Sequence, residues 1–111
     1  MIEKTVLDYL NQVLKIPAYM EEPEDPPVSY VLIEKTGGGC SEHIKRATIA
    51  IQSYAVSLYK AAELNETVKN AMEDIIKLPD VCRCDLNSDY NFTDPETHRY
   101  RYQAVFDLVH Y

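Results

Sequence analysis

The chain has 111 residues, which is enough for one domain with a single hydrophobic core but not for two. Its net charge is −7 and its 11 Lys and Arg residues are scattered, which excludes the clustered basic surface that binds nucleic acid. No apolar stretch approaches the ~20 residues of a membrane span, and the N-terminus has no signal-peptide core. We therefore expect a soluble protein made in the cytoplasm, with no contact to a membrane.

The first part of the chain predicts a helix followed by two strands. Apolar residues recur at helical spacing over Ile2–Leu14, and Ala18–Met20 can form a short edge strand. The segment Glu21–Pro27 is acidic and rich in proline, so it is predicted to be a loop. Ser29–Lys35 is apolar on both faces in its middle, which predicts a central strand.

A run of three glycines, Gly37–Gly39, is predicted to turn the chain. The alternating segment that follows, His43–Tyr54, would then pair with the second strand as a hairpin with a glycine tip. A phosphate-binding loop is the other interpretation of such a run, but it needs a helix after the glycines and the run is followed by a strand.

The second part of the chain predicts a long helix and two more strands. Ser57 is a suitable N-cap for the apolar stripe that extends over Leu58–Ile76. A fourth alternating strand covers Cys82–Phe92, and Thr93–Glu96 has the composition of a turn. From Arg99 to the end of the chain, apolar and polar residues alternate with the period of a strand that is buried on one side.

The predicted order is helix, strand, strand, strand, helix, strand, strand. This order is typical of an α+β domain in which two helices pack on one face of a mostly antiparallel sheet of four to five strands. No linker interrupts the pattern, so residues 1–111 are predicted to form a single domain.

The three cysteines, Cys40, Cys82 and Cys84, are an odd number without a secretion signal, which argues against a disulfide framework. Cys82 and Cys84 are two residues apart and are predicted to share one strand face. We expect all three thiols to be buried and reduced.

Two kinds of chemistry can be weighed against the sequence. Cys40, Glu42 and His43 lie close together but have no catalytic motif around them, and no carboxylate pair has an acid–base context. The sequence thus favours a protein that is not an enzyme and has no cofactor.

A calcium loop is the other possibility, because oxygen-bearing side chains fall at EF-hand positions 1, 3, 5, 7 and 12. The sixth position should be glycine but is Tyr90, and the flanks read as strands. The competing interpretation is that the first four of these residues form the solvent-facing side of the fourth strand. The calcium candidates are Asp85, Asn87, Asp89, Asn91 and Glu96.

A family resemblance extends over nearly the whole chain. The segments that carry it are the helix Ile2–Leu14, the strands Tyr30–Glu34 and Ala47–Tyr54, the helix from Ser57 to Val81, and the final strand Tyr102–Val109. In this order they resemble the small tail terminator, or tail completion, proteins of long-tailed bacteriophages.

The resemblance implies a non-enzymatic protein of the virion tail or neck. Such a protein forms a ring, expected to be a hexamer, that caps the tail tube, stops its polymerisation and joins tail to head. The implied partners are further copies of the chain, the tail tube protein and a head–tail connector or neck protein. A head–tail neck adaptor or minor capsid protein is the close alternative, and a small calcium- or ligand-binding module is an alternative of a different class.

Subunit and partner contacts are expected in loops and at a free sheet edge such as Ala18–Met20. An acidic ring would also repel DNA passing through it, with Asp85 and Asp89 as the residues that line the channel. The predicted contact residues come from the glycine run, the acidic loop and the last turn. They are Gly37, Gly38, Gly39 and Cys40; Glu21, Glu22, Glu24 and Asp25; and Asp94, Pro95 and Glu96.

Overall fold

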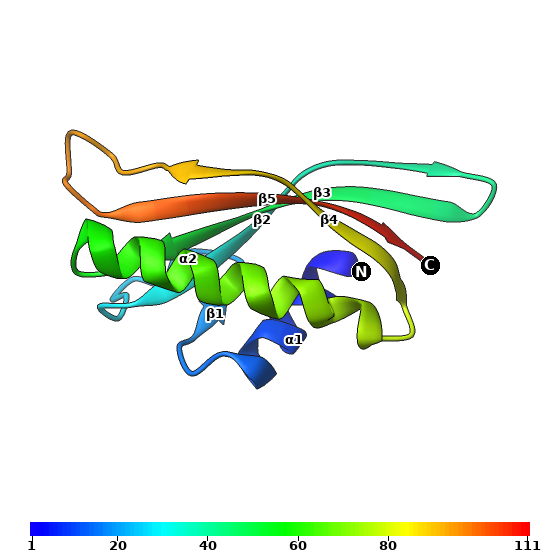
Figure 1. The fold of residues 1–111 in the computed structure, drawn as a ribbon, viewed down its shortest axis with the longest axis horizontal. Helices are drawn as coiled ribbons and strands as arrows, with labels where there is room; N and C mark the ends of the chain where they lie inside the picture. Colours follow the sequence, from blue (N-terminus) through cyan, green and yellow to red (C-terminus); the bar gives the residue numbers. More distant parts are fainter.

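A computed structural model describes all 111 residues and confirms the predicted α+β class and order of elements (Figure 1). Two helices lie on one face of a five-stranded sheet, and a short 3-10 helix, η1, follows the second helix. The elements are α1 (Ile2–Val13), β1 (Ala18–Tyr19), β2 (Tyr30–Ser41), β3 (Ile44–Tyr54), α2 (Leu58–Glu73), η1 (Asp74–Lys77), β4 (Val81–Asn91) and β5 (Arg101–His110).

The strand order in the sheet is β1-β2-β3-β5-β4, and every neighbouring pair is antiparallel except β1 and β2. The prediction that β2 is a central strand is confirmed only over the part of β2 that lies between β1 and β3. β1 pairs only with Val31 and Leu32, so the rest of β2 is an edge and β3 occupies the middle of the sheet. One face of β2 is apolar because it packs against the helices. The opposite face carries Leu32, which is half-buried.

The glycine run does not turn the chain, so that prediction is wrong. β2 continues through it, with Gly37 opposite Thr48 and Gly39 opposite Arg46. The turn lies at Glu42 and His43, which have φ angles of 52° and 68°. A two-residue hairpin turn of this type requires positive φ at both positions, and here two non-glycine residues adopt it.

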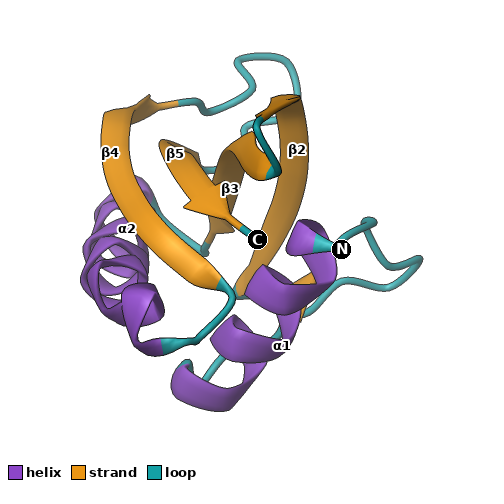
Figure 2. Cartoon of the chain, turned by 90° about the vertical axis from the view of Figure 1, so that its right-hand side faces the viewer, coloured by secondary structure: helices purple, strands orange, loops and turns teal.

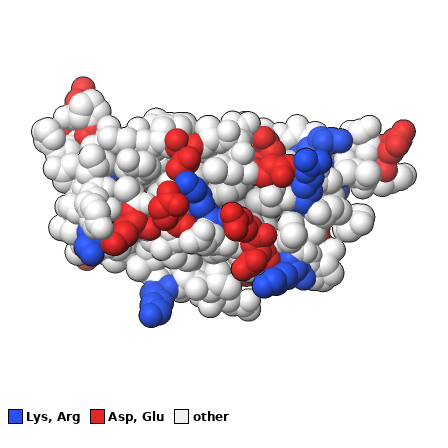
Figure 3. Space-filling view, viewed as in Figure 1, with Lys and Arg blue, Asp and Glu red and all other residues white.

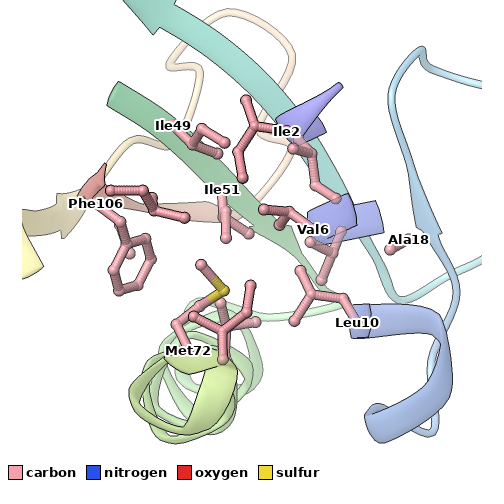
Figure 4. Close-up of a cluster of buried hydrophobic side chains, with 14 of the residues drawn as sticks. Ile2, Val6, Leu10, Ala18, Ile49, Ile51, Met72 and Phe106 are labelled. Atoms are coloured by element: carbon pink, nitrogen blue, oxygen red, sulfur yellow. The ribbon is translucent and has the colours of Figure 1, made fainter. Parts of the chain in front are cut away.

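The core lies between the sheet and the two helices (Figures 2 and 4). Sixteen buried residues form one cluster, with Val6 and Leu10 from α1 and Met72 from α2 facing Ile51 and Phe106 of the sheet. Burying a side chain of this size contributes about 1.5–3 kcal/mol, so this layer is the main source of stability.

Two local predictions are confirmed. The Ser57 hydroxyl accepts a hydrogen bond from the N–H of Lys60 (3.1 Å) and so caps α2. Ala104, Phe106 and Leu108 of the last strand are buried against the helices, as their alternation predicted.

The prediction of three buried thiols is wrong. Cys40 and Cys82 are exposed and Cys84 is half-buried, and none of them forms a disulfide. Cys40 lies where β2 extends beyond the helices, and Cys82 lies at a register shift between Val81 and Arg83. Burial, and secondarily the neighbouring Asp85 carboxylate, raises the pKa of the Cys84 thiol to about 12.

Candidate functional site at the loop end

The molecule is elongated, with extents of 44 × 25 × 25 Å, and its two ends differ. One end carries the connection between β4 and β5 and the start of α2, while the β2–β3 turn lies at the other (Figure 1). We name the first the loop end, formed by residues 20–29, 55–60 and 92–100. We name the second the arm, formed by residues 34–46, all exposed up to Arg46.

An ion pair joins the acidic loop to the segment before β5. The guanidinium of Arg99 donates to the Glu22 carboxylate and to the Tyr30 hydroxyl, which itself donates to Glu22 Oε1 (2.5 Å). The hydrogen bond from Arg99, followed by that from Tyr30, lowers the pKa of Glu22, while burial and the bond to Glu22 raise the pKa of Tyr30. Two loops far apart in the sequence are therefore held together by one charged group.

Aromatic rings and arginines stack beneath these loops. The rings of Tyr30 and Tyr54 are parallel, with centroids 4.5 Å apart, and the Arg99 guanidinium lies 4.8 Å from the Tyr54 centroid. Arg101 lies 4.4 Å from the centroid of Phe92. Each such contact contributes about 0.5–1 kcal/mol at a partly exposed site, so the stack fixes the shape of the loop end.

A hydrogen-bond network continues the stack on the sheet face away from the helices. The Gln52 amide donates to Gln103 Oε1 (3.0 Å), and the Gln103 amide donates to the Tyr90 hydroxyl (2.5 Å). The Tyr54 hydroxyl donates to Gln52 Oε1 (3.3 Å). Both glutamines point away from the core yet are buried, because their neighbours cover them. Alternation alone marked both as solvent-facing, and only the pairing of Gln52 with Gln103 in the register reveals the network.

Two clefts flank Val56 on this surface. The first, of about 230 Å³, lies between the three segments of the loop end, and the second, of about 550 Å³, lies between the end of α1 and the start of α2. The Val56 side chain lines both clefts and is 69% exposed. Its other apolar walls are Pro26, Pro27, Val28, Ala55 and Tyr100 in the first cleft, and Ile16 and Leu64 in the second.

The structure brings together two of the three predicted contact segments. The acidic loop with Glu21, Glu22, Glu24 and Asp25 lies at the loop end, as does the turn Asp94–Glu96. The Asp94 carboxylate accepts from the N–H of Glu96 (2.9 Å), which lowers its pKa and orders the turn. The third segment, from Gly37 to Cys40, belongs to the arm at the opposite end.

The predicted calcium candidates do not converge. A register shift between Leu86 and Ser88 reverses the alternation of β4, so Asp85 and Asp89 lie on opposite faces of the sheet. The prediction that Asp85, Asn87, Asp89 and Asn91 form one solvent-facing side is therefore wrong. No group of three or more His, Cys, Asp or Glu side chains is placed to hold a metal ion.

Asp85 and Asp89 each have a partner within the chain. Asp85 pairs with Arg83 (2.6 Å). Asp89 accepts from the amide of Asn65 (2.9 Å) and from Lys69 Nζ (3.0 Å), beside α2. Asp85 and Asp89 cannot line one channel together, which corrects that expectation. On the face seen in Figure 3, acidic and basic side chains alternate without a continuous basic patch.

Sequence reasoning missed the apolar residues that the loop end exposes. Val28 lines the first cleft and is 70% exposed, and Tyr59, in the first turn of α2, is 73% exposed. The sequence could have indicated this exposure, because apolar residues outside the predicted helices and strands have no core position to fill. Val28 follows two prolines, and Val56 precedes the helix cap Ser57.

The structure defines the class as a two-layer α+β domain, and no helix in it is both long and apolar enough to span a membrane. No protein-family model matches the chain, and no curated protein matches its sequence significantly.

Proposed function

We propose that the protein is a non-enzymatic structural component of a phage virion that caps the tail tube, terminates its polymerisation and joins tail to head. The resemblance in the order of elements supports this proposal. The structural observation that carries it is the two-ended shape: an apolar and acidic loop end faces away from an exposed strand arm across a 44 Å molecule.

A joining protein contacts two different partners at the same time, so it needs two separate surfaces. The loop end offers exposed apolar residues among carboxylates, which is the composition of a contact surface. The arm offers the free backbone edge of β2, on which the three residues of the glycine run carry no side chain. The two surfaces are therefore chemically distinct as well as distant.

Ring formation has a physical basis in the sheet edges. β4 has no neighbour on its outer side, and β2 is uncovered beyond Leu32. These edges are much longer than the Ala18–Tyr19 strand, and each offers free N–H and C=O groups to a second copy. A closed ring, here a hexamer, limits growth where an open head-to-tail contact would form a filament.

Deletion of the reading frame from a phage that carries it tests the function. Electron microscopy of the particles should show overlong tails of variable length, because nothing stops the tube. A plasmid copy of the gene should restore normal tails. Normal-length tails beside unjoined heads would replace this proposal with a neck adaptor, and normal infectious virions would end both.

A further inference from the structure

We infer that the loop end is the docking surface for the end of the tail tube, and that the tube presents there apolar side chains flanked by Lys or Arg. This inference rests on the proposed function and adds to it the surface and the chemistry of the partner. It is carried by the exposed Val56 side chain between two clefts and by the carboxylates of the loop end.

The apolar part of the surface is a ridge, formed by the Val56 side chain, with a cleft on each side. Val56 stands between two clefts and is 69% exposed, and Val28, which lines the first cleft with it, is 70% exposed. Hydration of such side chains is unfavourable, and a partner that fills both clefts around the ridge would remove them from water together. The Glu22–Arg99 ion pair and the Tyr30–Tyr54 stack hold the walls in place before binding.

The charged rim specifies what kind of partner fits. Glu22 and Arg99 neutralise each other, as do Lys60 and Glu63 (3.3 Å). The remaining carboxylates have no basic partner, so the rim is negative and favours a partner with Lys or Arg at the edge of its apolar contact. These carboxylates are Glu21, Glu24, Asp25, Asp94 and Glu96.

Binding to tail tubes purified from the deletion phage tests the inference. The purified protein is mixed with tubes, the tubes are pelleted, and the bound protein is quantified as a function of its concentration. We expect Val56→Asp, and separately Glu24→Lys with Asp25→Lys, to weaken binding by roughly tenfold or more. Binding of the wild type should also weaken as salt rises, because the rim charges are exposed.

Matched controls lie on the far side of the molecule. Ile76→Asp places the same charge on an apolar side chain that is 53% exposed in η1, and Asp80→Lys reverses a carboxylate beside β4. Both should bind tubes like the wild type. All variants change exposed residues, and far-UV circular dichroism should confirm that each one is folded.

Several outcomes would overturn the inference. They are equal binding by loop-end and control variants, binding of the wild type to purified heads but not to tubes, binding to neither particle, or self-association of the wild type that Val56→Asp abolishes. Each of these can occur while the deletion phage still makes overlong tails. Failure of this docking surface is therefore distinguishable from failure of the proposed function.

Discussion

The hydroxyl of Ser53 is fully buried in β3 and has no hydrogen-bond partner. An unsatisfied buried hydroxyl costs about 1–3 kcal/mol, and alanine removes it without leaving a large cavity. We therefore expect Ser53→Ala to raise the free energy of unfolding by about 1 kcal/mol, measured by urea denaturation.

Ser57 supplies the opposite case for comparison. Its hydroxyl caps α2, so Ser57→Ala should lower the free energy of unfolding by about 1 kcal/mol in the same experiment. A decrease for both variants would mean that Ser53 has a stabilising partner, such as a bound water.

The three thiols should react at different rates. Cys40 and Cys82 are exposed, whereas Cys84 is half-buried and burial raises its pKa to about 12. Because the thiolate is the reactive form, Ellman's reagent at pH 8 should modify two thiols quickly and the third slowly. Cys84→Ser should remove only the slow phase. Equal rates for three thiols would contradict this picture.

At the scale of whole elements, the Glu22–Arg99 pair joins the acidic loop to the segment before β5. The folded-state pKa of Glu22 is lowered, so its stabilisation is present above the ordinary glutamate pKa of about 4.3 and is lost as the pH falls through the folded-state pKa. The pair is well exposed, so we expect an effect below about 1 kcal/mol.

The measurement is the melting temperature of the wild type and of Glu22→Gln at pH 7 and pH 3. The variant should be less stable than the wild type at pH 7 and nearly equal to it at pH 3. Glu24→Gln is the control, because Glu24 forms no ion pair. A difference between wild type and Glu22→Gln that persists at pH 3 would assign the effect to something other than the carboxylate charge.

Replacing different glycines of β2 by alanine should have different effects on stability. A Cβ at Gly38 would lie 2.9 Å from Lys35 Cε and 3.1 Å from the Arg46 carbonyl oxygen, whereas a Cβ at Gly39 would meet nothing within 4 Å. Gly in a strand costs roughly 0.5–1 kcal/mol relative to Ala, so Gly39→Ala should stabilise the protein by up to about that amount. Gly38→Ala should lose this gain to the close contact with the carbonyl. Thermal unfolding should give a higher melting temperature for Gly39→Ala than for Gly38→Ala, and equal melting temperatures would contradict this prediction.

The elements with one continuous buried face were predictable from the sequence. The stripes of α1 and α2 and the alternation of β5 each repeat without interruption, so the local pattern determines which side is buried. β4 was predictable as a strand but not in its faces, since register shifts at Cys82 and Asn87 reverse its alternation and depend on pairing with β5.

The structures of the loop end and of the glycine run could not be predicted from the local sequence, because they depend on contacts between distant segments. Glycine prefers turns, but pairing with β3 overrides that preference and moves the turn to Glu42 and His43. The exposed carboxylates of the loop end were predicted as contacts, but its apolar ridge at Val56 and the ion pair between Glu22 and Arg99 arise only when distant segments meet.

At the scale of the whole molecule, one core supports two different ends. The sixteen-residue cluster includes side chains from both helices and from all five strands. The arm continues β2 and β3 of this cluster, and the loop end is continuous with β2, β3 and β5, so we expect both ends to unfold together with the helices. This rigidity is what would let a subunit hold one partner at each end in a fixed relation.

Two spectroscopic signals can test this cooperativity. Far-UV circular dichroism at 222 nm reports the helices, while near-UV circular dichroism reports the tyrosines, of which Tyr30 contacts both Tyr19 and Tyr54 next to the loop end. For a single cooperative unit, the two urea transitions coincide. Glu22→Gln at one end should shift both transitions to lower urea and Gly39→Ala at the other should shift both to higher urea, and their effects on the free energy of unfolding should add within about 0.5 kcal/mol because the sites share no contacts. If the tyrosine signal were lost at lower urea than the helix signal, the loop end would be an independent unit, and it could order itself on its partner instead of presenting a preformed surface.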